Sequence, residues 1–429
     1  MTTIQTFRRT LIALAATATL GVGTQARAEV FVQCGPNNAG VDANGMIRPA
    51  YDVDPSVGGT KDSGAQCMHL SAGDGFIKMA DGRELYTFGF TDVTKRSASQ
   101  VTLASLDANF AAPTIELKQG KDFYLTLTNV AMTMRPDLFD PHTVHFHGFP
   151  QQPPVFDGMP EGSFGVNMGS SFTYFYRLND PGTYMYHCHQ EATEHMQMGM
   201  LGNLYVTPLQ DGTPKSFGGK TYTRFVYNDG DGSTGYDVSK PLQLLSMDSQ
   251  FHDLHLGVQP LPFKNMRDDY AMINGRGYPD TVNPAPLDPP TQKIDVLTGG
   301  GVALGDIKSS QPINALVTAV KGQRILLRLS NLNVTNYYTV TAQGLPMKVV
   351  GVGARQLRGP SLDGGTTPGK DLYFETSSVT LGGGESTEVM IDTRQVEPGT
   401  YFLYTTNLNF LSNGTEDSGG MMTEIVVSN

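Results

Sequence analysis

The sequence predicts an all-β protein made of two tandem Greek-key β-sandwich domains. Glycine (49 residues) and proline (26 residues) are abundant, and this composition favours many turns over long helices. From about residue 84, short segments of alternating polarity such as Phe123–Thr128 lie between turn-forming residues, which is typical of half-buried strands. The phrase Asp-Pro-Gly-Thr-Tyr at 180–184 recurs as Glu-Pro-Gly-Thr-Tyr at 397–401. This recurrence indicates two diverged copies of one domain.

The chain begins with a segment typical of an export signal. Arg8 and Arg9 precede a short apolar run at 11–22, which is too short to span a bilayer. The small residues at 26–28 resemble a cleavage site, so residues 1–28 are predicted to be a signal peptide and the mature chain to be periplasmic or secreted. The arginine pair leaves both the twin-arginine and the ordinary Sec route open. No later apolar stretch is long enough for a membrane span.

Four further parts follow the predicted signal peptide. They are an irregular, turn-rich segment at 29–80, a first β domain at 81–208, a polar linker at 209–219 and a second β domain at 220–429. The irregular segment carries Cys34 and Cys67, and we expect a disulfide between them because an oxidising compartment favours it. Cys188 is then the odd cysteine, which requires an explanation of its own.

The charge balance narrows the kinds of partner. The chain has a formal net charge of −11, and removing residues 1–28 removes three arginines and no acids, which leaves −14. An acidic surface argues against binding to nucleic acid or anionic membranes. It favours cationic or neutral partners.

Six of the nine histidines form two clusters around Cys188. The first cluster is His142-Thr-Val-His145-Phe-His147, and the second is His187-Cys188-His189 followed by His195 and Met200. Side chains on a strand alternate between its faces, so His145 shares a face with His147, and His187 shares a face with His189, opposite Cys188. The residues therefore separate into one set with His142, Cys188, His195 and Met200, and another set of four histidines.

The first set has the donors of a blue copper site. One thiolate, two imidazoles and a weak axial thioether are the ligands that such a site requires, whereas structural zinc sites usually use more thiolates. Met200 is the expected axial ligand, and Met196 and Met198 are its neighbours and competitors. Four imidazoles without a thiolate suit copper or another borderline metal.

The two motifs His142-x-x-His145-x-His147-Gly148 and His187-Cys188-His189…His195…Met200 make the sequence resemble the multicopper oxidases and their relatives with tandem cupredoxin domains. The resemblance implies two cupredoxin-like domains and assigns copper roles to these residues. Type 1 copper would be held by His142, Cys188, His195 and Met200, type 2 copper by His145, and the type 3 pair by His147, His187 and His189. Asp157 matches an acid that relays protons in the family, although it also reads as an ordinary Asp-Gly turn residue.

The second domain departs from the family pattern. A trinuclear cluster in this family requires four histidines from each of two facing domains. Aligning the Pro-Gly-Thr-Tyr repeats places residues 404–406, Tyr-Thr-Thr, opposite 187–189, and the segment 336–344 contains no histidine. His252 and His255 are the histidines that remain, and we expect them to lie in a surface loop.

Three arrangements of the four-histidine set remain open. In the first, two copies of the first domain face each other in a homo-oligomer, which can be a dimer or a trimer. In the second, the four histidines form no copper cluster, and only the electron-transfer copper is present. A third arrangement takes His252 or His255 from a neighbouring subunit, as in the trimeric copper nitrite reductases that this layout also resembles. Those enzymes carry an acid between the first two copper histidines, where this chain has Thr143 and Val144, which counts against nitrite reduction.

We therefore expect a copper-dependent oxidoreductase. It would oxidise a small organic molecule or a metal ion by single electrons at type 1 copper, with oxygen as the acceptor. The alternatives are a blue copper protein that only carries electrons or binds copper, and an enzyme like the copper nitrite reductases.

Overall fold

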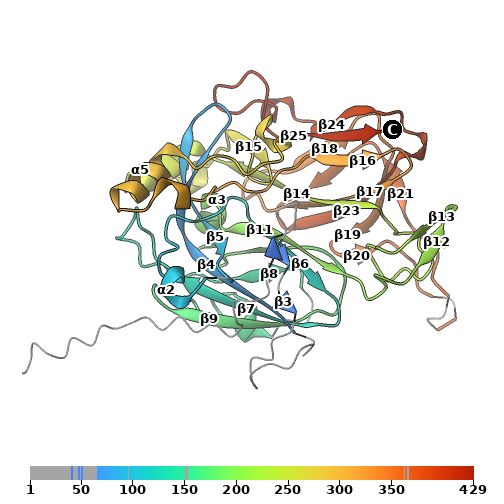
Figure 1. Ribbon diagram of the computed structural model, residues 1–429, viewed down its shortest axis with the longest axis horizontal. Coiled ribbons are helices and arrows are strands. Elements are labelled where there is room, and N and C mark those ends of the chain that lie inside the picture. Colours follow the sequence, from blue (N-terminus) through green and yellow to red (C-terminus); the bar gives the residue numbers. More distant parts are fainter. Residues whose placement is uncertain are drawn as a thin grey trace, which may run out of the picture.

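In the computed structural model, residues 65–429 are described apart from 95, 150–152, 362 and 365–366, together with three short strands that precede them. The chain forms two β-sandwiches that stack on each other (Figure 1). The predicted fold class, two tandem β-sandwich domains, is confirmed. The predicted signal peptide and Cys34 lie outside the described residues, so export and the Cys34–Cys67 disulfide stay predictions.

The first sandwich consists of two sheets. One sheet has the strand order β3-β4-β7-β9, with β5 also pairing with β4, and the other has the order β1-β2-β6-β11-β10-β8. Their strands are β1 (Gly40–Val41), β2 (Ile47–Arg48), β3 (Ala50–Tyr51), β4 (Ala65–Lys78), β5 (Glu84–Asp92), β6 (Ala112–Lys118), β7 (Asp122–Asn129), β8 (His145–His147), β9 (Ser171–Arg177), β10 (Gly182–His187) and β11 (Leu201–Thr207). The prediction of irregular structure up to residue 80 is wrong from Ala65, because β4 is a continuous strand that pairs with both β5 and β7.

The second sandwich also consists of two sheets. They have the strand orders β15-β14-β17-β23-β19-β20, with β21 also on β19, and β16-β25-β24-β18-β22. Their strands are β14 (Val238–Met247), β15 (Tyr270–Ile273), β16 (Val317–Val320), β17 (Arg324–Asn331), β18 (Tyr338–Ala342), β19 (Met347–Val352), β20 (Arg355–Gln356), β21 (Phe374–Thr376), β22 (Val379–Leu381), β23 (Glu385–Asp392), β24 (Gly399–Thr405) and β25 (Met422–Ser428).

The pairing pattern repeats between the sandwiches, as the recurring Pro-Gly-Thr-Tyr phrase predicts. Strand β10 lies between β8 and β11, both antiparallel to it, and β11 runs parallel to β6. Strand β24 lies in the same way between β18 and β25, and β25 runs parallel to β16. The end of β24 is therefore the structural counterpart of the end of β10, where His187 lies.

Short helices and one hairpin complete the fold. The α-helices are α2 (Ala98–Val101), α3 (Ala192–Met198), α4 (Ser249–Leu256) and α5 (Thr291–Gly299). Single 3₁₀ turns are η1 (Pro154–Phe156), η2 (Phe263–Asn265), η3 (Asp280–Val282), η4 (Leu304–Asp306), η5 (Thr393–Gln395) and η6 (Leu408–Phe410). The hairpin of β12 (Lys215–Phe217) and β13 (Lys220–Tyr222) begins inside the predicted linker, so that stretch is partly ordered as strand. Within the described part of the chain, no helix is long and apolar enough to cross a membrane.

The two sandwiches are held together through β10, which packs against β17 and β23. The backbone N–H of Thr183 donates to Glu388 Oε1 over 2.7 Å, and Ser386 donates its hydroxyl to the carbonyl of Thr183 over 2.7 Å. A Cβ on Gly182 would lie 2.7 Å from the Cβ of Ala354, so only glycine permits this close approach. The strand that ends in His187 is thus fixed against the second sandwich.

Candidate metal centre

Cys188 follows the last residue of β10 and is buried between two histidines. Its Sγ lies 3.2 Å from Nδ1 of His195 and 4.0 Å from Nδ1 of His142. One ligand atom from each of the three residues lies within 4.8 Å of the others, and all three side chains are buried. The backbone N–H of Thr143 points at the sulfur over 3.4 Å, which favours a thiolate. The structure therefore brings together the three strongest predicted type 1 ligands.

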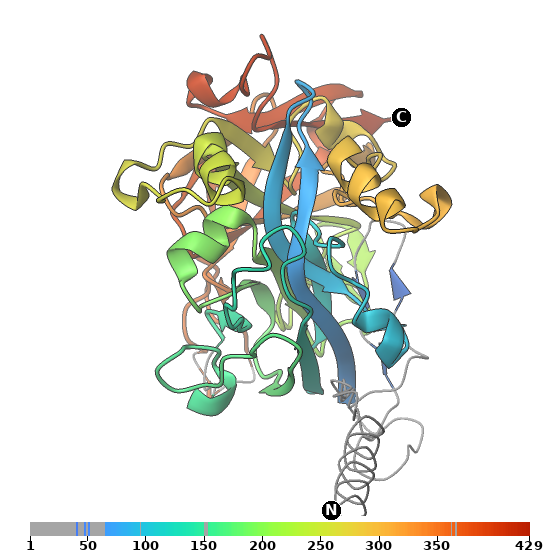
Figure 2. The same cartoon turned by 90° about the vertical axis from the view of Figure 1, so that its left-hand side faces the viewer.

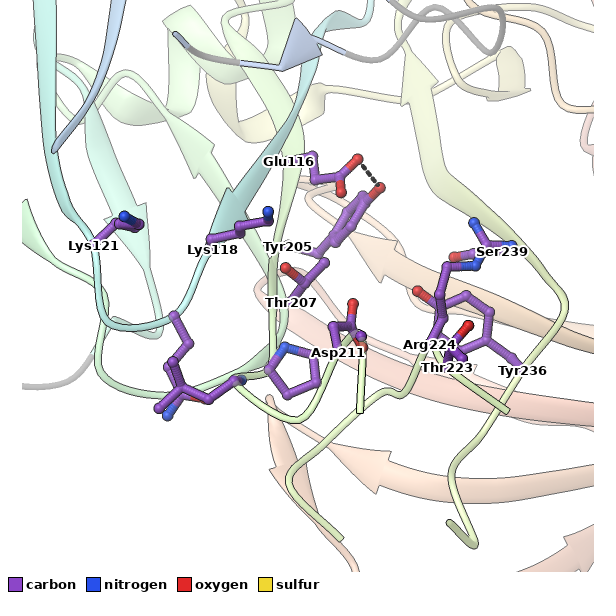
Figure 3. Close-up of a pocket in the computed structure, with 14 residues that line it drawn as sticks. Glu116, Lys118, Lys121, Tyr205, Thr207, Asp211, Thr223, Arg224, Tyr236 and Ser239 are labelled. Atoms are coloured by element: carbon purple, nitrogen blue, oxygen red, sulfur yellow. Dashed lines mark hydrogen bonds between the residues drawn. The ribbon is translucent and has the colours of Figure 1, made fainter. Parts of the chain in front are cut away.

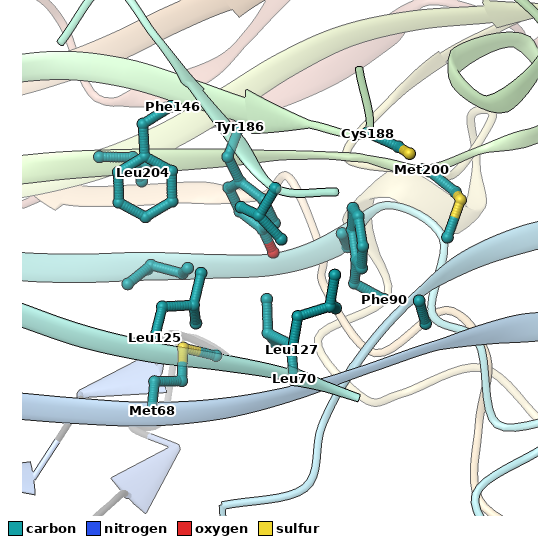
Figure 4. Packing of buried hydrophobic residues seen from close by; sticks show 14 of the residues in the cluster. Met68, Leu70, Phe90, Leu125, Leu127, Phe146, Tyr186, Cys188, Met200 and Leu204 are labelled. Carbon is teal, nitrogen blue, oxygen red and sulfur yellow. The ribbon is translucent and has the colours of Figure 1, made fainter. Parts of the chain in front are cut away.

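The loop from Cys188 to Met200 is shaped by helix α3 and the glycine that ends it. Gly199 has φ +119°, and a Cβ there would lie 2.7 Å from the carbonyl oxygen of Phe88. This turn brings Met200 back beside the cysteine, so that the Cys188 N–H donates to the Met200 carbonyl over 3.0 Å. Figure 4 shows the two sulfur-bearing side chains next to each other in the apolar core of the first sandwich.

The alternative thioethers differ in where they pack. Met198 is buried in the same apolar cluster as Cys188 and Met200, whereas Met196 packs against a different cluster near the second sandwich. Met200 stays our predicted axial ligand.

Burial sets the protonation of this site. It raises the pKa of the Cys188 thiol to about 11, and it lowers the pKa of His195 to about 4 and that of His142 well below its usual value. Both imidazoles therefore keep a free lone pair at neutral pH, and the thiol requires a bound cation to replace its proton. One sulfur and two neutral ring nitrogens in a dry pocket fit a copper ion of the blue type.

Three of the other four histidines form a second group. His145 and His147 lie on β8, and His187 is opposite His145 in the antiparallel register with β10. Nδ1 of His147 lies 3.4 Å from Nε2 of His187, and one ring nitrogen from each of the three residues lies within 4.8 Å of the others. Burial lowers the pKa of His145 and His147 and lowers that of His187 to about 3. All three are therefore neutral, as metal ligands must be.

His189 and Asp157 lie at the edge of this second group. The ring of His189 is 5.1 Å from that of His145 and 5.5 Å from that of His187, centroid to centroid, but His189 is not part of the three-nitrogen group. Nδ1 of His145 lies 2.6 Å from the carbonyl oxygen of Asp157 and 3.5 Å from its Oδ1. Asp157 therefore orients a histidine, and its role as a proton relay stays a prediction.

The prediction that His252 and His255 lie in a surface loop is wrong. Both lie on α4 and are buried, with exposed fractions of 0% and 2%. The two ring nitrogens of His252 lie 2.5 Å from the carbonyl of Tyr86 and 3.0 Å from the carbonyl of Gln197. Nε2 of His255 lies 2.7 Å from Glu194 Oε1. Because these contacts are made within one chain, neither histidine is available to a neighbouring subunit.

Helices α3 and α4 consequently lie side by side across the junction of the sandwiches (Figure 2). The spacing of three between His252 and His255 is a helical spacing, which puts both side chains on one face. That spacing was the signal in the sequence that pointed to a helix rather than a loop.

A group of acids beside His195 has no signal in the sequence. A ring nitrogen of His195 and one carboxylate oxygen each from Asp140, Glu191 and Glu194 lie within 4.8 Å of one another. Among the described residues, Nε2 of His195 is buried and has no hydrogen-bond partner. Burial raises the pKa of Asp140, and the nearby Glu194 raises it further. Three carboxyl groups therefore lie together at the edge of the Cys188 site.

A separate pocket of about 540 Å³ lies at the junction between the first sandwich, the hairpin region and β14 (Figure 3). Its walls carry both signs of charge, including Glu116, Lys118, Asp211 and Arg224. Tyr205 donates to Glu116 Oε2 over 3.0 Å, and burial raises the pKa of Asp211 to about 6. The pocket contains no histidine or cysteine, and we interpret it as part of the domain junction.

Two family models, each described as multicopper oxidase, match residues 89–211 and 254–428. The chain is 23% identical over 254 residues to copper resistance protein A of Pseudomonas syringae pv. tomato, which is 58% of this chain and 38% of that protein. It is 31% identical over 107 residues to L-ascorbate oxidase of Cucurbita pepo var. melopepo, which is 24% of this chain and 18% of that protein.

The solved structure of a blue copper oxidase from Nitrosomonas europaea has the same fold. It aligns with a TM-score of 0.58 at 22% identity and covers 85% of this chain and 86% of its own. The match thus covers well under half of the length of these two curated relatives, but most of the length of the blue copper oxidase from Nitrosomonas europaea.

Proposed function

Because the chain belongs to the multicopper oxidase family, we propose that it is an exported copper-dependent oxidoreductase that takes single electrons from a reductant beside His195 and delivers them to oxygen. The observation that carries the proposal is the position of Cys188. Its side chain faces His142 and His195, whereas His187, the residue before it, belongs to the second group of histidines and His189, the residue after it, lies at the edge of that group. Two adjacent sites are therefore joined through consecutive residues of one chain.

The residues of the Cys188 site prepare it for fast electron transfer. Copper held by Cys188, His142, His195 and Met200 would supply the one-electron redox chemistry. The N–H of Thr143 stabilises the thiolate, and its hydroxyl accepts a hydrogen bond over 3.0 Å from the N–H of His189, which ties the two sites together. The apolar core around the sulfur excludes water. A ligand set fixed in this way reorganises little when an electron arrives.

The acids beside His195 favour a cationic reductant. One carboxylate oxygen each from Asp140, Glu191 and Glu194 lies within 4.8 Å of a ring nitrogen of His195, the imidazole at which we propose that electrons enter the Cys188 site. Carboxylate oxygens with one imidazole suit ferrous or manganous ions better than cuprous ions, which prefer sulfur. We therefore place a metal ion ahead of a neutral organic molecule as the reductant.

Oxygen uptake by the purified, copper-loaded full chain tests the proposal. We expect ferrous ion to drive oxygen consumption and a Cys188→Ser variant to lose both the blue colour and this activity. A protein that is bleached by reductants but consumes no oxygen with ferrous ion or with phenols contradicts the proposal. That result would favour an electron carrier, which the absence of a second histidine set in the residues after 255 also favours.

A further inference from the structure

We infer that the trinuclear cluster of the family is replaced in this chain by a single-metal site of three imidazoles, His145, His147 and His187, completed within one chain. That this site accepts the electrons rests on the proposed function. That it binds one metal ion rests on the number of histidines and on their geometry. It differs from the sequence-based roles, which divide these residues between type 2 and type 3 copper.

The donor count excludes a family-type cluster between the two sandwiches. The chain has nine histidines, and only His252 and His255 follow His195. Both are buried in contacts with backbone carbonyls or with Glu194. The second sandwich therefore has no free imidazole to offer, either to its own chain or to a neighbouring copy.

Two of the three ring nitrogens are already at the spacing that one metal ion requires, and the third imidazole lies beside them. Metal–nitrogen bonds of about 2.0–2.1 Å at tetrahedral angles put two ligand nitrogens roughly 3.3 Å apart. Nδ1 of His147 and Nε2 of His187 are 3.4 Å apart, and one ring nitrogen from each of the three histidines lies within 4.8 Å of the others. A cation between these lone pairs removes their mutual repulsion.

Backbone carbonyls fix which nitrogen each histidine presents. Nδ1 of His145 donates to the carbonyl of Asp157 over 2.6 Å, and Nδ1 of His187 donates to the carbonyl of Cys188 over 2.9 Å. In both residues Nε2 is left with its lone pair. Metal-binding histidines are typically oriented by a second contact of this kind.

The third histidine is positioned by the second sandwich. Gly384, which has φ +89°, lies so close to His147 that a Cβ there would be 2.8 Å from Nε2 and 2.9 Å from Cε1. The N–H of Gly384 donates to the carbonyl of Asn331 over 2.8 Å, which fixes this turn. Because the Nε2 edge of His147 faces Gly384, Nδ1 is the nitrogen that faces His187. The second sandwich thus contributes a wall and no ligand.

Three imidazoles and no thiolate define the chemistry. Neutral imidazoles suit copper, zinc and nickel, and copper binds most tightly in this series. Three protein ligands leave a coordination position for a small molecule, as in catalytic rather than structural sites. His189 lies outside the three-nitrogen group and is not required for binding.

Copper counting in the Cys188→Ser background tests the inference on the full chain, since the type 1 copper is then absent. We expect about one copper per chain, with the electron paramagnetic resonance spectrum of an isolated cupric ion and the same stoichiometry at all protein concentrations. A further His147→Ala change should abolish this copper, and a matched His189→Ala change should retain it.

Several results would overturn the inference. One is that the Cys188→Ser protein binds no copper. Another is that His189→Ala loses as much copper as His147→Ala does. The third is that the copper forms a spectroscopically silent pair that is found only in oligomers. Because the count uses no turnover, a protein that binds this copper but consumes no oxygen refutes the proposed function and leaves the inference standing.

Discussion

Replacing Gly384 with alanine perturbs the second metal site without replacing a ligand. The new Cβ would meet the His147 ring at 2.8 Å and 2.9 Å, distances at which one of the two groups must move. The residue also has φ +89°, a left-handed conformation that costs an L-residue about 1–2 kcal/mol. Displacing an orienting contact of a metal ligand typically lowers metal affinity about 10- to 100-fold. We expect Gly384→Ala both to lower the free energy of unfolding and to weaken metal binding at the second site.

Gly322→Ala provides a matched control for the backbone cost. Gly322 lies in the same sandwich with φ +92°, and a Cβ there would meet no atom within 4 Å. Both variants should lose about 1–2 kcal/mol of unfolding free energy through the backbone conformation in denaturant titrations, and Gly384→Ala should lose more because of its contact with His147. Only Gly384→Ala should weaken the second copper, measured by competition with a chelator, while the blue absorption stays unchanged in both. Equal copper affinity in the two variants would refute the packing argument.

Three further predictions concern the acids beside His195, the buried His69 and the product formed from oxygen. Asp140→Asn combined with Glu191→Gln should raise KM for ferrous ion about tenfold, with KM for a neutral phenol unchanged; a parallel rise for both reductants would contradict a cation site. Burial lowers the pKa of His69 to about 4, so between pH 6.5 and 4 only the unfolded chain binds that proton. The free energy of unfolding should therefore decrease as the pH falls across this window. In urea titrations, the decrease for the His69→Gln variant should be smaller than that of the unchanged protein by up to about 3 kcal/mol. One type 1 copper and one three-histidine copper store two electrons, which matches O₂ + 2e⁻ + 2H⁺ → H₂O₂. The oxidase should thus release close to one peroxide per oxygen, measured by adding catalase, and water as the product would argue for a larger cluster.

The parts of the structure that could be predicted are those with a local pattern. The alternation of His145 with His147, and of Cys188 with its neighbours, separates two ligand sets because a strand has a period of two. The Pro-Gly-Thr-Tyr repeat predicts that β10 and β24 are counterparts, and they are. Strand β4 was missed because glycine and aspartate residues at 73–75 resemble a turn, whereas its pairing with two neighbouring strands keeps it extended.

Features that depend on contacts distant in sequence could not be predicted. Asp140 lies close to His195 because the loop before His142 lies beside α3, and no spacing between residues in the sequence indicates this proximity. His255 meets Glu194 across 61 residues, and Gly384 meets His147 across more than 200. Each of these pairs joins two elements whose mutual placement follows from packing of the sheets. Sequence motifs therefore indicate the candidate ligands, but they do not indicate the residues that position those ligands.

The second sandwich supplies none of the predicted ligands, but it contacts both candidate metal sites. On one side, α4 brings His255 to Glu194, the residue next to the ligand His195, and the same imidazole lies 3.0 Å from a guanidinium nitrogen of Arg135. On the other side, Gly384 lies against the ring of His147. Because β10 also packs against β17 and β23, the second sandwich holds the strand that ends in His187 as well. We therefore expect the second sandwich to set the geometry at both ends of the path through Cys188.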